Sequence, residues 1–231
     1  MTTDPEPREE TRHQFGEDLD ALRRETIQLG SLVLENVRRL TEALTENRLD
    51  VAEAVIEADD EIDERYEVLE RKTFRLIALQ APVASDLRFL VSITRMLYEI
   101  ERSGDLAVNA AKGLLRRSGY ELGAQTRGIL ARLCRATTDI FGAGLVVLDE
   151  MDAEGGARLD SDDDVVDDLV GELYRMISDA DLDVDTAIEL SRAGRYLERI
   201  ADHAVNIGDH VSFIVTGSFP RGKHPGTVDE D

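Results

Sequence analysis

Two stretches of the chain carry the same pattern, E-R-x-x-D-x-A-V-N, at an offset of 97 residues. The repeated polar positions are Glu101, Asp105 and Asn109 in the first copy and Glu198, Asp202 and Asn206 in the second. On a helix, residues four apart lie one turn apart along a single stripe. Two carboxylates placed in this way repel each other unless a cation lies between them. The pattern therefore indicates cation coordination by oxygen ligands.

The similarity between the two copies is concentrated at their polar positions. Residues 95–116 align with residues 192–213 with seven identities in 22 positions, and six of the seven fall within nine residues. A need for packing alone would preserve the apolar stripe and let exposed carboxylates diverge. The polar positions therefore meet a requirement of their own.

Each copy has a second pair of acids in the helix before it. These pairs are Asp59 with Asp63 and Asp163 with Asp167. A bend near residue 82 separates Asp59 and Asp63 from the first motif, and a bend near residue 181 separates Asp163 and Asp167 from the second. In each half, the number of residues from the acid pair to the bend is about the same as the number from the bend to the motif. Antiparallel packing would bring them level. Each half of the chain is thus expected to gather four carboxylates and an amide oxygen.

An all-oxygen ligand set suits hard or borderline cations: Mg²⁺, Mn²⁺, Ca²⁺ or iron, with Mg, Mn or Fe favoured here. Nearby arginines are expected to pair with these acids or to contact a partner protein, and they are Arg88, Arg95, Arg102, Arg192 and Arg199. The competing interpretation is that the acids only form surface ion pairs. His203 is rotated about 100° from Asp202 on a helix and is expected to pack or to face water rather than to bind metal.

Apolar residues recur at helical spacing through nearly the whole chain, and no sustained two-residue alternation is present. The expected helices span about 13–46, 49–80, 85–118, 122–151, 162–177 and 184–216, with a break at Gly155 and Gly156. Ser85 or Asp86 is expected to cap the third helix, and Phe74 and Leu87 are expected to be buried. The sequence predicts an all-α fold of six long helices, arranged as two tandem three-helix bundles related by internal duplication.

The predicted domain boundaries follow the repeat. Residues 13–119 form the first three-helix unit and residues 120–217 the second. The acidic segment 1–12 and the segment 218–231 are expected to be disordered.

Composition restricts the environment and the partners. Forty-nine acidic against 27 basic residues give a net charge of −22, which disfavours binding to nucleic acid. Cys134 is the only cysteine, so a disulfide within the chain is excluded. No secretory signal and no apolar run of about 20 residues is seen, so we expect a cytoplasmic protein without membrane insertion, able to dock peripherally at the inner face of the membrane through partners.

Enzyme motifs are not evident. A ferritin-like di-metal oxidase needs a Glu-x-x-His on each of two helices, and the chain has this spacing only at Glu10 and His13. There is no P-loop and no nucleophile elbow. A non-enzymatic role is expected, either as a metal-binding regulator or as an acidic scaffold that docks a basic partner without metal.

At these residues the sequence resembles the PhoU family. The matching stretches are 86–88 with Arg95, 101–109 and 195–207, and the resemblance covers residues 15 to 217. It implies two three-helix repeats with metal clusters at E/D-x-x-x-D motifs, and negative control of the phosphate-starvation response. It also implies contacts with the phosphate-sensing histidine kinase and with the ATPase subunit of the phosphate ABC importer. A homodimer is compatible with the pattern but not required by it.

Two positions depart from the family pattern. Ala201 stands where the second motif usually has glycine, and the sequence Asp183-Val184-Asp185 replaces the Asp86-Leu87-Arg88 of the first half. Equal metal occupancy of the two halves is therefore not implied by the resemblance.

Overall fold

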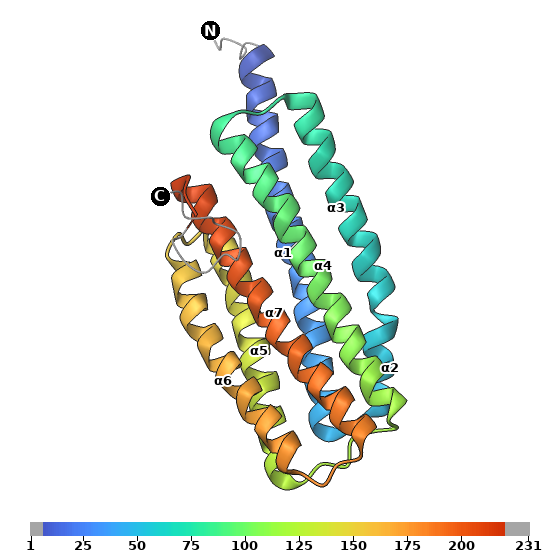
Figure 1. The fold of residues 1–231 in the computed structure, drawn as a ribbon. Coiled ribbons are helices and arrows are strands. Elements are labelled where there is room, and N and C mark those ends of the chain that lie inside the picture. The colour runs from blue at the N-terminus through green and yellow to red at the C-terminus, as the bar shows by residue number, and fades with distance from the viewer. Residues whose placement is uncertain (1–6, 220–231) are drawn as a thin grey trace.

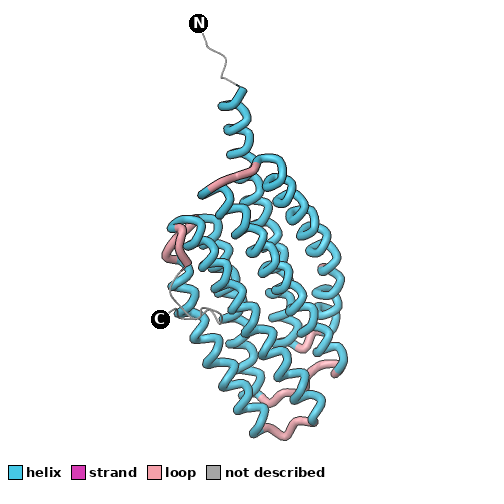
Figure 2. The backbone as a smooth tube through the Cα atoms, turned by 45° about the horizontal axis from the view of Figure 1, so that its top comes forward, coloured by secondary structure: helices cyan, strands magenta, loops and turns pink. Residues whose placement is uncertain are grey.

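The computed structural model describes residues 7–219, and within this range it contains seven α-helices and no strands (Figure 1). Their bounds are α1 Pro7–Glu46, α2 Leu49–Glu57, α3 Asp59–Gln80, α4 Ala84–Arg116, α5 Ala124–Glu150, α6 Gly155–Asp179 and α7 Val184–Thr216. The helices run side by side along the long axis, and the connections gather near the two ends (Figure 2). The all-α prediction is confirmed.

The helix expected over 49–80 is interrupted at Ala58, which separates α2 from α3. No proline or glycine causes the interruption. Asp59, Asp60 and Glu61 fill the first turn of α3, where the partial positive charge of a helix N-terminus favours carboxylates. The run of acids therefore favours a new helix start, and it places Asp59 at that start.

The predicted break at Gly155 and Gly156 is wrong, because both glycines lie in the first turn of α6. The break falls instead between Met151, which has a φ of 52°, and Glu154. A Cβ on Gly208 of α7 would come within 2.8 Å of the Gly156 Cα. The glycines allow α6 and α7 to approach closely rather than ending a helix.

Three other expectations about helix ends and burial need correction. Helix α1 begins at Pro7, so residues 7–12 are helical; residues 1–6 and 220–231 lie outside the described residues. The cap of α4 is Val83, and no side chain caps that helix. Phe74 and Leu87 are 50% and 38% exposed, respectively. Phe74 belongs to α3, which packs on α1 and α4 at the edge of the bundle and so has only one covered face.

One continuous core joins the two halves of the chain. Leu22, Leu29 and Leu40 of α1, Ile100 of α4 and Phe141 of α5 are fully buried. The first half contacts the second mainly through α4 on α7 and α1 on α5, and in Figure 1 α4 and α7 lie side by side. These two central helices carry the two copies of the repeated motif.

Ion pairs link the end of α4 to the start of α7. The Arg116 guanidinium donates to both carboxylate oxygens of Glu189, at 3.1 and 2.7 Å, and these bonds lower the pKa of the buried Glu189. Arg117 donates to Asp183 at 2.7 Å, and Asp183 caps α7 by accepting from the Thr186 backbone N–H. Asp183, the departure from the family pattern, thus has a structural role between the halves.

Candidate metal sites

The first acid cluster forms where α3 packs against α4. Burial, together with the carboxylates of Asp105 and Asp63, raises the pKa of Glu101 to about 7. Burial also raises the pKa of Asp59, with Asp63 and Asp105 adding to the effect. Carboxylates perturb one another in this way only when they lie close together. The structure therefore brings Asp59, Asp63, Glu101 and Asp105 near one another. The two acids of α3 lie beside the two acids of α4, as the residue count from the bend predicts.

The second cluster forms in the same way where α6 packs against α7. Burial, together with the carboxylates of Asp202 and Asp167, raises the pKa of Asp163 to about 7. The pKa of Asp202 is also raised by burial, with Glu198 as the largest charged contribution. The second half thus repeats the arrangement of the first.

One buried oxygen in each cluster has no hydrogen-bond partner within the described residues. These atoms are Oδ1 of Asp59 and Oδ1 of Asp163, which occupy matching places in the two acid pairs. A buried acceptor without a donor is costly, and native structures rarely leave one unexplained. Carboxylate oxygens are also the ligands that hard cations prefer. The donor set of both clusters fits such a cation.

In the described part of the chain, however, no three acidic, histidine or cysteine side chains converge closely enough to hold a metal ion. Arg102 donates to Asp105 at 2.9 Å, and Arg195 is paired with Glu198. Each of these ion pairs engages one carboxylate of its cluster. Coordination would require these partly exposed side chains to rotate.

The five arginines chosen from the sequence have different surroundings. Arg102 is paired within the first cluster, whereas Arg192 pairs with Glu189 at 3.1 Å near the start of α7, away from both clusters. Arg95 and Arg199 line a groove beside the second cluster. Arg88 lies against Gly217 at the end of α7, and its Nε is buried without a hydrogen bond in the described region. Arg195, which pairs with Glu198, was not among the five.

The two amide residues also differ. Asn109 is exposed, and no contact of its side chain with the first cluster is seen among the described residues. Asn206 lies in the groove beside the second cluster and hydrogen bonds to Glu99. Of the two predicted amide ligands, only Asn206 lines the same groove as its cluster, and its assignment as a ligand stays a prediction.

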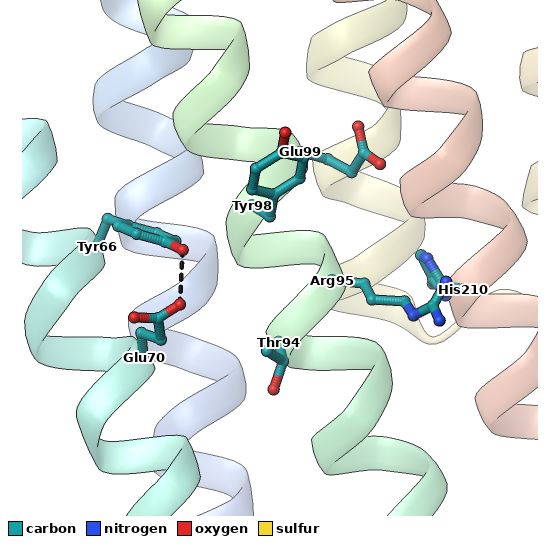
Figure 3. Close-up of a pocket in the computed structure, with 7 residues that line it drawn as sticks. All are labelled: Tyr66, Glu70, Thr94, Arg95, Tyr98, Glu99 and His210. Atoms are coloured by element: carbon teal, nitrogen blue, oxygen red, sulfur yellow. Dashed lines mark hydrogen bonds between the residues drawn. The ribbon is translucent and has the colours of Figure 1, made fainter.

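The groove has a volume of about 800 Å³, and its lining comes from α4, α6, α7 and Phe219. It shares Arg95, Tyr98, Glu99 and His210 with a smaller hollow of about 390 Å³ that reaches Tyr66 and Glu70 of α3. Figure 3 shows Arg95 extending from α4 towards His210 of α7, and Tyr66 donating to Glu70 at 2.7 Å. The two hollows together extend over the surface of α4, from α3 on one side to α6 and α7 on the other.

A buried polar network between α4 and α7 was missed by the sequence reasoning. The Ser103 hydroxyl donates to the Glu99 backbone carbonyl at 2.8 Å and lies 2.9 Å from Nδ1 of His203. Nε2 of His203 lies 3.5 Å from the Glu99 carboxylate. Burial, with Arg199 and Arg102 nearby, lowers the pKa of His203 to about 4, so the ring is neutral at pH 7. Of the two alternatives for His203, packing and facing water, the structure shows packing.

A sequence signal for this network did exist. Ser92, Met96, Glu99 and Ser103 follow one another at spacings of four, three and four, which is one helix face. A polar side chain on a helix face that is otherwise buried needs a hydrogen-bond partner, so it indicates a polar side chain on the neighbouring helix. These positions are not repeated in the second half, so comparing the two copies does not reveal them.

Comparison with known proteins identifies relatives of the whole chain. A family model described as the PhoU domain matches residues 26–114 and again residues 130–211, so each match contains one copy of the repeated motif. A protein from Synechocystis sp. named phosphate-specific transport system accessory protein PhoU homolog is 34% identical over 209 residues, covering 89% of this chain and 93% of the relative. A homolog from Mycobacterium leprae is 34% identical, covering 91% and 96%.

Two solved structures have the same fold. The crystal structure of the phosphate transport system regulatory protein PhoU from Streptococcus pneumoniae superposes with a TM-score of 0.81 and 26% identity, covering 89% of this chain and 99% of that one. PhoU from Pseudomonas aeruginosa gives a TM-score of 0.82 and 25% identity, covering 88% and 100%. The likeness extends over both halves.

Proposed function

This chain belongs to the PhoU family, and from that premise we propose that it is a non-enzymatic accessory regulator of phosphate transport. The relatives that share about a third of its residues over nearly their whole length are named as accessory proteins of the phosphate-specific transport system. The repeated acid motif, rather than any arrangement of nucleophile and base, is the chemical feature that both halves share.

The regulator acts, in this proposal, with Mg²⁺, Mn²⁺ or iron bound at each acid cluster. The observation that carries the metal proposal is the pair of buried oxygens without hydrogen-bond partners, Oδ1 of Asp59 and Oδ1 of Asp163, at matching places in the two halves. A cation would satisfy these atoms and offset the burial and the repulsion that together raise the pKa of Glu101 and of Asp163 to about 7.

The proposed partners are the phosphate-sensing histidine kinase and the ATPase subunit of the phosphate importer. Contact with them would place the protein at the cytoplasmic face of the membrane. No helix in the described range is long and apolar enough to cross a bilayer. Negative control of the phosphate-starvation response would follow from these contacts. Deleting the gene should then switch on a phosphate-starvation reporter in phosphate-rich medium.

Metal content tests the sites directly. Purified wild type, Glu101→Gln/Asp105→Asn and Glu198→Gln/Asp202→Asn are incubated with Mn²⁺, desalted and measured by elemental analysis. Each double variant should lose about half of the bound metal, because each removes ligands from one cluster only. Glu53→Gln/Glu57→Gln is the matched control, since it neutralises an exposed pair four residues apart on α2.

The results separate the two functional interpretations. If the control loses as much metal as the two test variants, the ion is only attracted by the net charge of −22. If wild type binds no stoichiometric Mg²⁺, Mn²⁺ or iron, the metal proposal is wrong.

The second interpretation, a metal-free acidic scaffold for a basic partner, has one observation in its favour. Arg102 and Arg195 already pair with one carboxylate of each cluster. A scaffold of this kind would show the same melting temperature with Mg²⁺ as with a monovalent salt of equal ionic strength. A metal site would instead raise the melting temperature with increasing metal concentration.

A further inference from the structure

A carboxylate from the first half of the chain lies beside the second acid cluster. Glu99 of α4 lines the groove of about 800 Å³ that is also lined by Asp163 and Asp202. Burial raises the pKa of Glu99, and the carboxylate of Asp202 contributes to the rise, as neighbouring charges do. None of the four acids of the first cluster lines this groove. Glu99 therefore faces the second site, although its helix carries the first motif.

Glu99 is held in place by α7. Its side chain is only 18% exposed, and one of its carboxylate oxygens lies 3.5 Å from Nε2 of His203. The other ring nitrogen of His203, Nδ1, lies 2.9 Å from the hydroxyl oxygen of Ser103. A side chain that is packed on both sides in this way has few rotamers available. The carboxylate of Glu99 is therefore a fixed acceptor at the interface of α4 and α7.

The group that this acceptor binds is an amide of the second motif. The Glu99 carboxylate is hydrogen bonded to the Asn206 side chain. An ionised carboxylate only accepts hydrogen bonds, so the amide nitrogen of Asn206 is the donor. The bond fixes the plane of the amide and does not use its oxygen. Asn206 lies one turn from Asp202 on α7, and both residues line the groove.

We propose that Glu99 is a positioning residue for the second metal site, because it holds the Asn206 amide with its oxygen available to the cation. This inference rests on the metal sites proposed above. Groups that orient a metal ligand without touching the metal change the affinity by about 10- to 100-fold when they are removed. The second site is thus completed by a residue of the first half, and the two halves are not independent metal-binding units.

The first half does not have the same arrangement. At the offset of 97 residues, the position that matches Glu99 is Tyr196. Asn109, which matches Asn206, is exposed, and no contact of its side chain with the first cluster is seen within residues 7–219. Removal of the Glu99 carboxylate should therefore weaken the second site alone.

Mn²⁺ binding to the full chain tests this role. Each site is measured by itself in the double variant, defined above, that removes acids of the other site, and the loss of the EPR signal of free Mn²⁺ reports binding. Adding Glu99→Ala should weaken the second site by about tenfold or more and leave the first site unchanged. Glu53→Ala removes one charge from an exposed position of α2 and should leave both sites unchanged.

Two further variants separate positioning from charge. Glu99→Gln removes the charge but keeps an oxygen that can accept from Asn206, so it should keep most of the affinity. Asn206→Ala should weaken the second site as much as Glu99→Ala, and the combination should be no weaker than either, because the two residues act as one unit. If Glu99→Gln binds as weakly as Glu99→Ala, or if the two losses add, Glu99 does not act through Asn206.

The remaining outcomes distinguish this role from the metal proposal itself. If wild type binds Mn²⁺ at both sites and Glu99→Ala leaves the second unchanged, only the positioning role is wrong. Equal weakening of both sites by Glu99→Ala would show a general effect on the bundle, and weakening by Glu53→Ala would show an effect of net charge; either result overturns the role. If wild type binds Mn²⁺ at neither site, the metal proposal fails and the positioning role fails with it.

Discussion

Glu101→Gln should stabilise the protein in the absence of divalent cations and weaken its response to them. Burial raises the pKa of Glu101 to about 7 in the folded protein, from 4.5 when unfolded. Between these pH values the folded state binds the extra proton, so stability is lost as the pH rises towards 7. Glutamine carries no charge and does not incur this loss.

The magnitude follows from the pKa difference. Without screening, the rise in pKa from 4.5 to about 7 corresponds to about 3 kcal/mol. Glu101 is only half-buried, so solvent screening reduces the expected gain to about 1 kcal/mol at pH 8. For a chain of this size, that is about 2–4 °C in melting temperature. The gain should shrink as the pH is lowered from 8 towards 5.5.

The assay is thermal unfolding of wild type and variant, with a chelator and then with Mn²⁺. Mn²⁺ at 100 times its dissociation constant should stabilise wild type by about 2.7 kcal/mol per site, and the variant by less, so the order of stability reverses. The control Glu64→Gln, at an exposed position of α3, should change stability by less than about 0.5 kcal/mol. No gain for Glu101→Gln at pH 8 in chelator would refute the coupling of the carboxylates. Equal stabilisation of variant and wild type by Mn²⁺ would refute Glu101 as a ligand.

Three further predictions concern the scaffold. Arg116→Ala should destabilise the protein by about 2 kcal/mol in urea unfolding, because the buried Glu189 loses two hydrogen bonds; a loss below about 0.5 kcal/mol would contradict the link between α4 and α7. Gly208→Ala should cost about 1–3 kcal/mol by the same measurement, since its methyl group would meet the α6 backbone at 2.8 Å, whereas Gly128→Ala has open space and should be neutral or stabilising. Cys134 should resist a thiol reagent in the native protein and react on unfolding, because it is buried and burial raises its pKa to about 12; rapid native labelling would show that the core opens.

The helices could be predicted from the sequence because helix formation depends on the spacing of apolar residues within each segment. Local signals were less reliable at the ends. Gly155 and Gly156 were interpreted as a break, yet their function depends on the approach of α7, which no local pattern reveals. The interruption at Ala58 likewise depends on a balance of charges at a helix start.

The sequence also allowed us to predict that each acid pair lies beside the repeated motif of the neighbouring helix. Each helical residue adds the same rise, so a residue count gives a position along the helix, and this count places Asp59 and Asp63 beside Glu101. Their assignment as metal ligands stays a prediction. The sequence could also identify the duplication, because the two copies of the motif are compared directly.

Only the tertiary structure decided which side chains of different helices meet. Glu99 and His203 are about 100 residues apart, and their contact depends on the rotation of α4 against α7 rather than on either helix alone. The groove beside the second cluster likewise exists only because α4, α6 and α7 pack together. Repeating patterns along the chain determine helices and registers, whereas the contacts between distant segments arise only when those helices pack.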